Sequence, residues 1–144
     1  MILSSSGFAR RLEQKPGAGK LVINPYVSEC QQPASYDLRS ASDITLMRGK
    51  CTLVPTLEWV ELPVDLAGTL MCRSSFGRKG VLLGAGFVDP GFRGQLTLCL
   101  TNMGDDLLVR KNDRIVQMIL HEVWGGGDGY VGRYQDSIGA VEAK

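Results

Sequence analysis

A series of short apolar runs separated by turn-forming residues is the feature that most limits how this chain can fold. From Leu21 onward, Pro, Gly, Asn or Asp stands between the runs, which is typical of β-strands. The segment from Gln95 to Thr101 alternates strictly, with a leucine at every second position, as in a half-buried strand. No long helical pattern and no regular exchange of strands with helices occurs. The sequence therefore predicts an all-β sandwich or barrel.

The strand pattern also predicts where the elements lie. A short helix is expected over Phe8 to Gln14, with Ser5 or Ser6 as its cap, before the break at Pro16-Gly17-Ala18-Gly19. The turn Arg48-Gly49-Lys50 is expected to join the strands Ile44 to Met47 and Cys51 to Pro55. The expected strands are Ile44 to Met47, Cys51 to Pro55, Trp59 to Leu62, Ala67 to Cys72, Val81 to Leu83, Gly86 to Val88, Gln95 to Thr101, Leu107 to Val109 and Ile115 to Val123.

The character of the chain changes after Trp124. Gly125-Gly126-Gly127-Asp128-Gly129 follows, and consecutive glycines are costly to hold in one conformation. We therefore expect a β domain over residues 1–124 and a flexible C-terminal arm over residues 125–144. Two tyrosines and an arginine in the arm suggest a lid that orders over a ligand.

Charge and composition exclude several classes of partner and site. The net charge is only +1, so we expect no binding to nucleic acid or to an anionic membrane surface. No apolar run is long enough to span a membrane and no signal peptide is recognised, so a cytoplasmic location is expected. The four cysteines form no Cys-x-x-Cys pair, and the single histidine, His121, excludes a multi-histidine metal centre. We expect mostly buried, reduced thiols.

Two polar segments have the composition of a nucleotide site. Arg73-Ser74-Ser75-Phe76-Gly77-Arg78-Lys79-Gly80 combines cations, hydroxyls and glycines, which suit a polyphosphate, although a solvated basic turn would look the same. Gly84 to Gly94 contains Asp89 after an apolar strand, where a carboxylate can act as a general base. Phe92 offers a flat face for a sugar or base. Asp89 could equally cap a tight turn.

Three further segments complete the pattern. Gln117 is a polar residue in an apolar run, so it either satisfies neighbouring backbone or faces a ligand. Gln32 to Arg39 is an extended segment that carries one carboxylate, Asp37. Taken together and in this order, the segments resemble the motifs of the dUTPase and dCTP deaminase superfamily. The matching stretches are Gln32 to Arg39, Arg73-Ser74-Ser75, Gly84 to Gly94, Asn112 to Gln117, and Gly132-Arg133-Tyr134-Gln135.

The resemblance implies a distorted jelly-roll and a homotrimer with active sites between subunits. The arm of one subunit would cover the nucleotide of another. The resemblance also implies Mg²⁺ on the phosphates of dUTP or dCTP, and Asp37 would contact that ion through water.

The resemblance also assigns roles to individual residues. Asp89 would activate the attacking water, and Phe92 would pack on the deoxyribose. Main-chain groups around Gly84 and Gly86 would read the base. The phosphates would be held by Arg73, Ser74 and Ser75, by Gln117 from a neighbour, and by Arg133, Tyr134 and Gln135 of the arm.

Cys99 decides which branch of the superfamily we predict. Deaminases of this superfamily carry a catalytic glutamate ten residues after the hairpin aspartate, and here that position is Cys99. A thiol lacks the carboxylate needed to activate water against cytosine, so we predict hydrolysis of dUTP to dUMP and pyrophosphate. The first motif, the Arg73-Ser74-Ser75 segment and the arm favour a dCTP deaminase, either a simple one or a bifunctional, dUMP-forming one. A nucleotide-binding homologue without catalysis is the third alternative.

Overall fold

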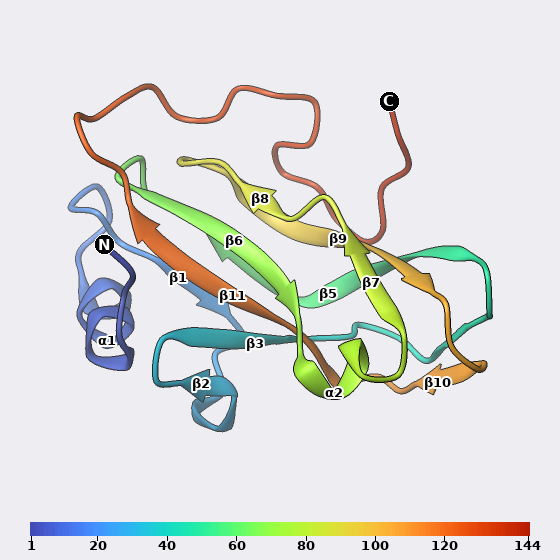
Figure 1. The fold of residues 1–144 in the computed structure, drawn as a ribbon. Helices are drawn as coiled ribbons and strands as arrows, with labels where there is room; N and C mark the ends of the chain where they lie inside the picture. Colours follow the sequence, from blue (N-terminus) through green and yellow to red (C-terminus); the bar gives the residue numbers. More distant parts are fainter.

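The computed structural model describes residues 1–144 and consists of two packed β-sheets. Figure 1 shows strands β6 and β11 in the nearer sheet and β5 and β9 in the farther one. The elements in chain order are α1 (Ser5–Glu13), β1 (Val22–Asn24), η1 (Ser28–Cys30), β2 (Gln31–Gln32), β3 (Ser35–Arg39), β4 (Ile44–Leu46), β5 (Cys51–Glu61), β6 (Leu66–Cys72), α2 (Ser74–Gly77), β7 (Val81–Gly84), β8 (Phe87–Val88), β9 (Arg93–Asn102), β10 (Leu107–Val109) and β11 (Arg114–Glu122).

The pairing of the strands confirms the all-β prediction. One sheet has the order β2-β3-β11-β6-β8, the other has β1-β5-β9-β7, and β4 pairs with β10 in a small third sheet. Every pairing between these strands is antiparallel. The two large sheets stay open at their edges, so the molecule is a jelly-roll-like sandwich and the closed barrel that we also considered does not form.

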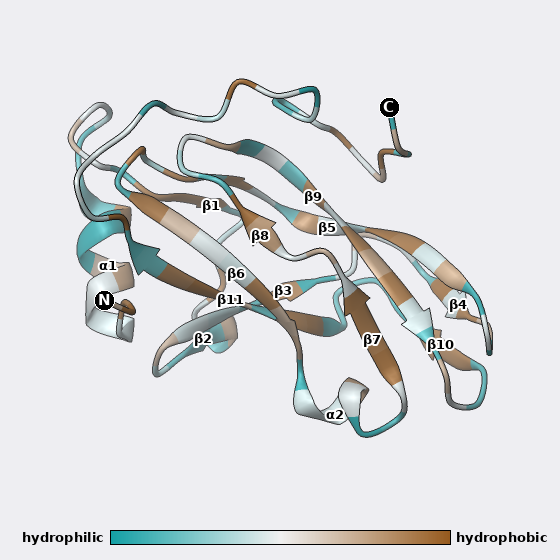
Figure 2. Ribbon diagram, turned by 45° about the horizontal axis from the view of Figure 1, so that its top comes forward, coloured by the Kyte–Doolittle hydropathy of each residue, from teal (hydrophilic) through white to brown (hydrophobic).

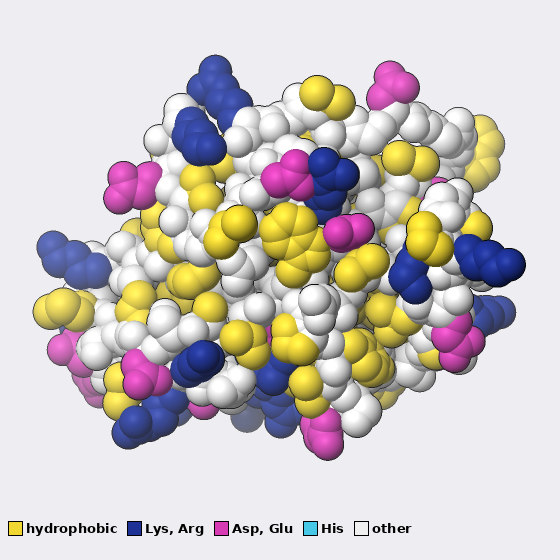
Figure 3. Space-filling model, turned by 180° about the vertical axis from the view of Figure 1, so that it is seen from behind, with side chains coloured by type: hydrophobic (Ala, Val, Ile, Leu, Met, Phe, Trp, Pro, Cys, Tyr) yellow, Lys and Arg dark blue, Asp and Glu magenta, His cyan; other side chains and the backbone are white.

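The core lies between the two large sheets. In β9 the residues alternate between buried and half-buried positions, with Leu96, Leu98 and Leu100 buried, as the period of two predicted. Figure 2 shows the matching alternation of hydrophobic and polar colour along the strands. On β5 the outward positions are Leu53, Pro55, Leu57 and Trp59, all half-buried. Seen from behind, hydrophobic side chains gather near the middle of this outer face (Figure 3).

A buried ion pair connects the two sheets. Glu58 on β5 is fully buried, and its carboxylate accepts hydrogen bonds from the backbone N–H of Arg39 at 2.9 Å and from Arg39 Nε at 2.6 Å. The strand is irregular between Pro55 and Trp59, where Pro55 has no N–H to offer a neighbour. Thr56 Oγ1 accepts from the backbone N–H of Leu96 at 2.9 Å and so repairs the pairing at this point.

Several predicted boundaries are wrong for local reasons. The helix begins at Ser5, earlier than expected, because Ser4 is its cap and accepts from the backbone N–H of Gly7. The runs from Cys51 to Pro55 and from Trp59 to Leu62 form one strand, β5, which bends at its irregularity. Arg48-Gly49-Lys50 does not close a hairpin, since β4 pairs with β10 instead of β5.

The arm after Trp124 folds back over the sandwich. Figure 1 shows it crossing one end of the molecule and turning down beside β9. Ser137 forms an isolated parallel bridge with Gly94, and the backbone N–H of Gln95 donates to the Ser137 carbonyl at 2.8 Å. None of the helices is long and apolar enough to cross a membrane.

We expect Glu58→Ala to lower the free energy of unfolding by about 3–5 kcal/mol, because it leaves the Arg39 guanidinium without its carboxylate in a mostly buried position. Denaturant unfolding of the two proteins measures this difference. Asp105→Ala is the matched control. It removes a fully exposed carboxylate 3.8 Å from Arg48, and should leave the unfolding midpoint unchanged. Equal effects of the two substitutions would contradict the importance of the buried pair.

Candidate functional site

A cavity of about 540 Å³ lies between the β7–β9 region and the C-terminal arm, and we call it the hairpin pocket. It brings together five of the predicted site residues: Gly84, Gly86, Asp89, Phe92 and Tyr134. Its other lining residues include Leu70, Phe87, Gln95, Thr97, Cys99, Tyr130 and Ser137. The lining is largely apolar with a few polar groups, as is usual for a site that binds a small organic ligand.

The backbone of the hairpin explains the glycines around it. Gly86 has a φ of 156° and its carbonyl accepts from the backbone N–H of Leu70 at 2.6 Å. A Cβ at Gly86 would lie 3.0 Å from the Leu70 carbonyl oxygen, so a side chain there would push the hairpin away from β6. Gly84 pairs with Cys99 on β9. The exposed main chain at Gly84 and Ala85 is therefore held firmly at the edge of the pocket.

Asp89 and Phe92 lie on the turn that enters β9. The backbone N–H of Phe92 donates to the Asp89 carbonyl at 3.2 Å, while the Asp89 side chain is exposed and free to face a ligand. The ring of Phe92 is buried and meets Tyr130 of the arm edge to face, with 5.7 Å between the ring centroids. The turn thus presents a carboxylate beside an aromatic wall.

The arm lies on the hairpin of its own chain. Gln135 donates to the Gly91 carbonyl at 2.9 Å, and its side-chain oxygen accepts from the backbone N–H of Arg93 at 2.9 Å. Asp136 forms a two-point ion pair with Arg93, with one contact at 3.0 Å, and the hydrogen bond from Arg93 lowers the pKa of Asp136. These links join the arm to the hairpin of the same chain, and coverage of another subunit's nucleotide by the arm stays a prediction.

Arg133 and Tyr134 differ in their placement. Tyr134 lines the hairpin pocket, whereas Arg133 is exposed and donates to the carbonyl of Lys144 at 2.8 Å. The predicted contact of Arg133 with a terminal phosphate remains a proposal. It requires the guanidinium to leave this backbone contact.

Cys99 lies in the hairpin pocket, at the position where the sequence comparison with deaminases put it. Burial raises the pKa of its thiol, and the neighbouring Cys51 raises it further, so the thiol is neutral at physiological pH. Asp89 is the one acidic side chain among the lining residues. The pocket therefore offers one carboxylate for proton transfer and no second one.

Asp37, Arg73, Arg114 and Gln117 gather elsewhere, on the five-stranded sheet, and we call them the arginine group. Gln117 pairs with Asp37 on one side and with Met71 on the other, so these three side chains share one face. Arg73 follows β6, and its Nε lies 3.0 Å from Asp37 Oδ2. The register of β11 puts Gln117 beside Asp37 and Met71 of its own chain, and its contribution to a neighbouring subunit's site stays a prediction. Ser74 and Ser75 begin α2 just beyond.

The two clusters lie at opposite ends of β6. Val88, next to Asp89, pairs with Gly68, and Ser74 is six residues further along the chain. At ~3.4 Å per strand residue this is a separation of roughly 20 Å. A hydrogen bond from Ser74 to a phosphate spans about 3 Å, and the Asp89 carboxylate would reach the same phosphate through one water molecule. One chain therefore cannot bring Ser74 and Asp89 to the same phosphate.

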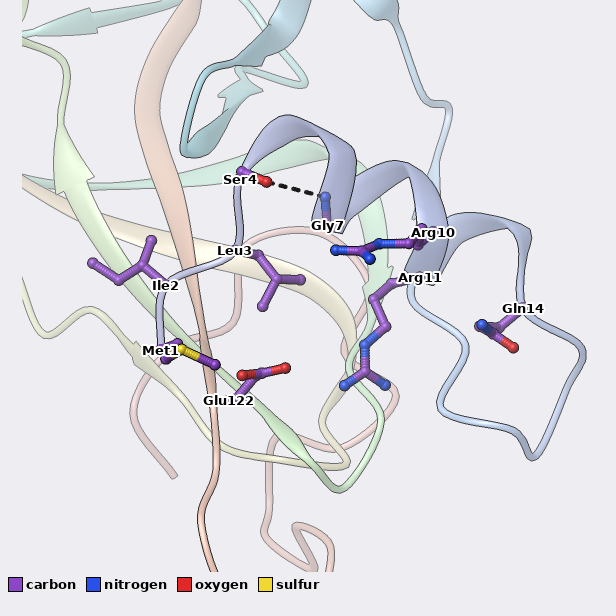
Figure 4. A pocket seen from close by; sticks show the side chains of 9 residues that line it. All are labelled: Met1, Ile2, Leu3, Ser4, Gly7, Arg10, Arg11, Gln14 and Glu122. Atoms are coloured by element: carbon purple, nitrogen blue, oxygen red, sulfur yellow. Dashed lines mark hydrogen bonds between the residues drawn. The ribbon is translucent and has the colours of Figure 1, made fainter.

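Another cavity, of about 370 Å³, opens between α1 and the end of β11 (Figure 4). Arg10, Arg11 and Glu122 surround it, and none of the predicted site residues does. Arg11 is already bound to Asp65 at 2.6 Å and to the Gly19 carbonyl at 3.2 Å. This cavity lacks the aromatic and backbone features of the hairpin pocket.

No residues form a cage for a metal ion. The chain has no group of three or more His, Cys, Asp or Glu side chains placed to hold one. His121 instead shares a hydrogen bond of 3.0 Å with Thr69 Oγ1. A magnesium ion on a bound nucleotide would need no such cage, because Mg²⁺ is commonly held by substrate phosphates and water.

Comparison with known proteins identifies the family of this chain. The family described as dCTP deaminase-like matches residues 40–123. The chain belongs to that family. It is 34% identical over 142 residues to the dCTP deaminase of Pyrococcus abyssi, covering 87% of this chain and 92% of the relative. It is 30% identical over 162 residues to a dUMP-forming dCTP deaminase of Methanopyrus kandleri, covering 85% and 82%.

The fold is shared with dUTPases as well. A solved structure of a mutant dUTPase of Staphylococcus bacteriophage 80alpha with dUpNHpp matches with a TM-score of 0.61 and 18% identity. The match covers 78% of this chain and 96% of the phage protein. The recognition of the dUTPase and dCTP deaminase superfamily from the motifs is thereby confirmed.

Sequence reasoning missed residues whose position depends on tertiary structure. Arg114 joins Asp37 at 3.5 Å, although it was only part of a matched motif. Gln95 and Thr97 line the pocket and accept hydrogen bonds from Gly139 and Val141 of the arm. Thr97 and Gln95 stand two and four residues before Cys99, on the same outward face of an alternating strand. That spacing could have predicted that they line the pocket together with Cys99.

The raised pKa of Cys99 predicts slow alkylation near neutral pH, because the thiolate is the reacting form. With iodoacetamide, the rate at Cys99 should keep rising beyond pH 9, and bound dUpNHpp should protect it. Peptide mass spectrometry resolves each cysteine. A rate that levels off below pH 8 would contradict a neutral thiol in the pocket.

Proposed function

We propose that this protein hydrolyses dUTP to dUMP and pyrophosphate in a site shared between the subunits of a homotrimer. The observation that carries the proposal is that Asp89 is the single carboxylate lining the hairpin pocket. Cys99 stands where the resemblance to deaminases implies a catalytic glutamate. Hydrolysis of a phosphoanhydride needs one base to activate water. Deamination needs a group that also shuttles protons to the leaving ammonia, and the pocket lacks it.

In this mechanism the nucleotide base lies against the main chain of Gly84 to Gly86, and the deoxyribose packs on Phe92. Asp89 accepts a proton from a water molecule whose oxygen attacks the α-phosphorus. The bond from the α-phosphorus to the bridging oxygen breaks, and pyrophosphate leaves with both electrons of that bond. Tyr134 and Gln135 help to keep bulk water away when the arm is closed.

The phosphates are held by the arginines and Gln117 of the arginine group and by Ser74 and Ser75. Guanidinium groups bind phosphate oxygens bidentately, and hydroxyls add further donors. Because the two clusters are roughly 20 Å apart along β6, the phosphate-binding residues facing a given Asp89 come from another subunit. This separation supports the shared site. Mg²⁺ bound to the nucleotide would neutralise phosphate charge during the reaction.

The names of the relatives favour a second candidate, deamination of dCTP. The Pyrococcus and Methanopyrus proteins are both called dCTP deaminases, and the latter forms dUMP. If this chain deaminates dCTP, a group other than Cys99 must supply the base. A protein that binds the triphosphate without turnover is the third possibility, and the same assay tests it.

The first test is a set of incubations with dUTP, dCTP and dTTP and Mg²⁺, followed by chromatography and an ammonia assay. We expect dUMP and pyrophosphate from dUTP and no ammonia from dCTP. Asp89→Asn should lower the rate by at least ~10²-fold, because the base is lost while shape is kept. Asp105→Asn, an exposed carboxylate outside the pocket, should not change it. An active Asp89→Asn protein would refute the role of Asp89.

A gain-of-function variant tests whether the missing carboxylate at Cys99 is what prevents deamination of dCTP. Cys99→Glu places a carboxylate in the hairpin pocket, opposite Gly84, and should create release of ammonia from dCTP. Cys99→Gln has the same shape without the charge and should not. Ammonia release by the unaltered protein would identify it as a deaminase, and binding of all three nucleotides without products would favour the binding-only alternative.

A further inference from the structure

The last part of the arm, residues 138–144, lies on the outer face of β9, and we call it the tail. The backbone N–H of Gly139 donates to Gln95 Oε1 at 2.7 Å. The backbone N–H of Val141 donates to Thr97 Oγ1 at 2.9 Å. Residues two apart on a strand share one side of it, so these two acceptors hold the tail in register along β9.

The tail reaches the hairpin pocket. On the outer side of β9 the next residue after Thr97 is Cys99, which lines the pocket. Val141 and Ala143 of the tail line it too. The tail therefore forms one wall of the cavity that contains Asp89.

The end of the tail also occupies two residues that were predicted to contact the ligand. Arg133 Nη1 donates to the Lys144 carbonyl at 2.8 Å, and Tyr134 Oη accepts from the backbone N–H of Lys144 at 3.3 Å. Lys144 Nζ donates to the Arg133 carbonyl at 3.3 Å and lies 5.9 Å from the centroid of the Tyr134 ring. Arg133 is absent from the lining of the hairpin pocket. The tail thus holds its guanidinium outside.

Few apolar contacts keep the tail in place. Exposure alternates along it, with Ser137, Gly139 and Val141 half-buried and with Ile138 and Ala140 exposed. Ile138 is 78% exposed, so its side chain adds little to the attachment. The tail is held mainly by single hydrogen bonds, each of which contributes only a modest net free energy. Segments with little buried apolar surface are the first to open.

We propose that the tail is an autoinhibitory strap, which narrows the hairpin pocket and withholds Arg133 until a nucleoside polyphosphate displaces it. The choice of ligand rests on the proposed function, whereas the strap rests on the contacts of the tail. A ligand that binds only the released form loses affinity in proportion to the fraction of molecules that are strapped. Weakening the strap should therefore tighten binding, which is the opposite of what the loss of a closing lid would do.

Two substitutions remove the same hydrogen bond from opposite sides. Thr97→Val deletes the acceptor, and Val141→Pro deletes the N–H donor. In calorimetric titrations with dUpNHpp and Mg²⁺, each variant should bind about three- to tenfold more tightly than the unaltered protein, as expected for one lost hydrogen bond. Thr101→Val is the matched control, because Thr101 lies on the same side of β9 but outside the pocket. It should bind normally. Unchanged or weaker binding by Val141→Pro would overturn the proposal.

Hydrogen exchange followed by NMR reports on the tail directly. In the unaltered protein, dUpNHpp should speed exchange at the backbone amides of Gly139 and Val141 at least threefold and slow it in the hairpin, residues 84–92. Slower exchange at Gly139 and Val141 would show that the tail closes over the nucleotide, and would refute the strap. Tighter binding by both variants without dUTP turnover would refute the proposed function and leave the strap standing. Hydrolysis of dUTP with unchanged affinity in both variants would do the reverse.

Discussion

Strand β6 is hydrogen-bonded on both sides, to β11 and to β8, and the positions of both halves of the site depend on this pairing. Its first half anchors the hairpin through Gly68 and Leu70, and its end carries Arg73 into contact with Asp37. Because a paired strand is stiff and extended, the two halves cannot approach each other within one chain. Under the proposed mechanism, the need for a second subunit therefore originates in the backbone.

The parts of the fold that depend on local pattern were predictable. Alternation identified β9 with its buried leucines, and the glycine run after Trp124 marked the start of the arm. Long-range pairing was not predictable. Nothing near Arg48 indicates that β4 pairs with β10, and nothing near Gln117 indicates that it shares a sheet face with Asp37. These relations depend on which strands meet, and a single sequence does not contain that information in any short segment.

Cys99 lies where the resemblance to deaminases of this superfamily implies a glutamate. Its neighbours on β9 still face the pocket, and the glycine backbone opposite it is still exposed. A thiol in such a half-buried place has neither the charge nor the full volume of a glutamate side chain. The scaffold tolerates the exchange because the core side of β9 is filled by leucines, which the substitution does not touch.

The attachment of the arm has a consequence for how the molecule responds to its ionic surroundings. Arg93 and Asp136, which tie the arm to the hairpin, are each about half exposed, at 52% and 50%. Dissolved ions screen exposed charges over about 8–10 Å at ordinary salt concentrations. Salt should thus weaken this contact of the arm, while the covered pair of Arg39 and Glu58 is screened far less. The sandwich therefore keeps its own ion pair under conditions that weaken the one between arm and hairpin.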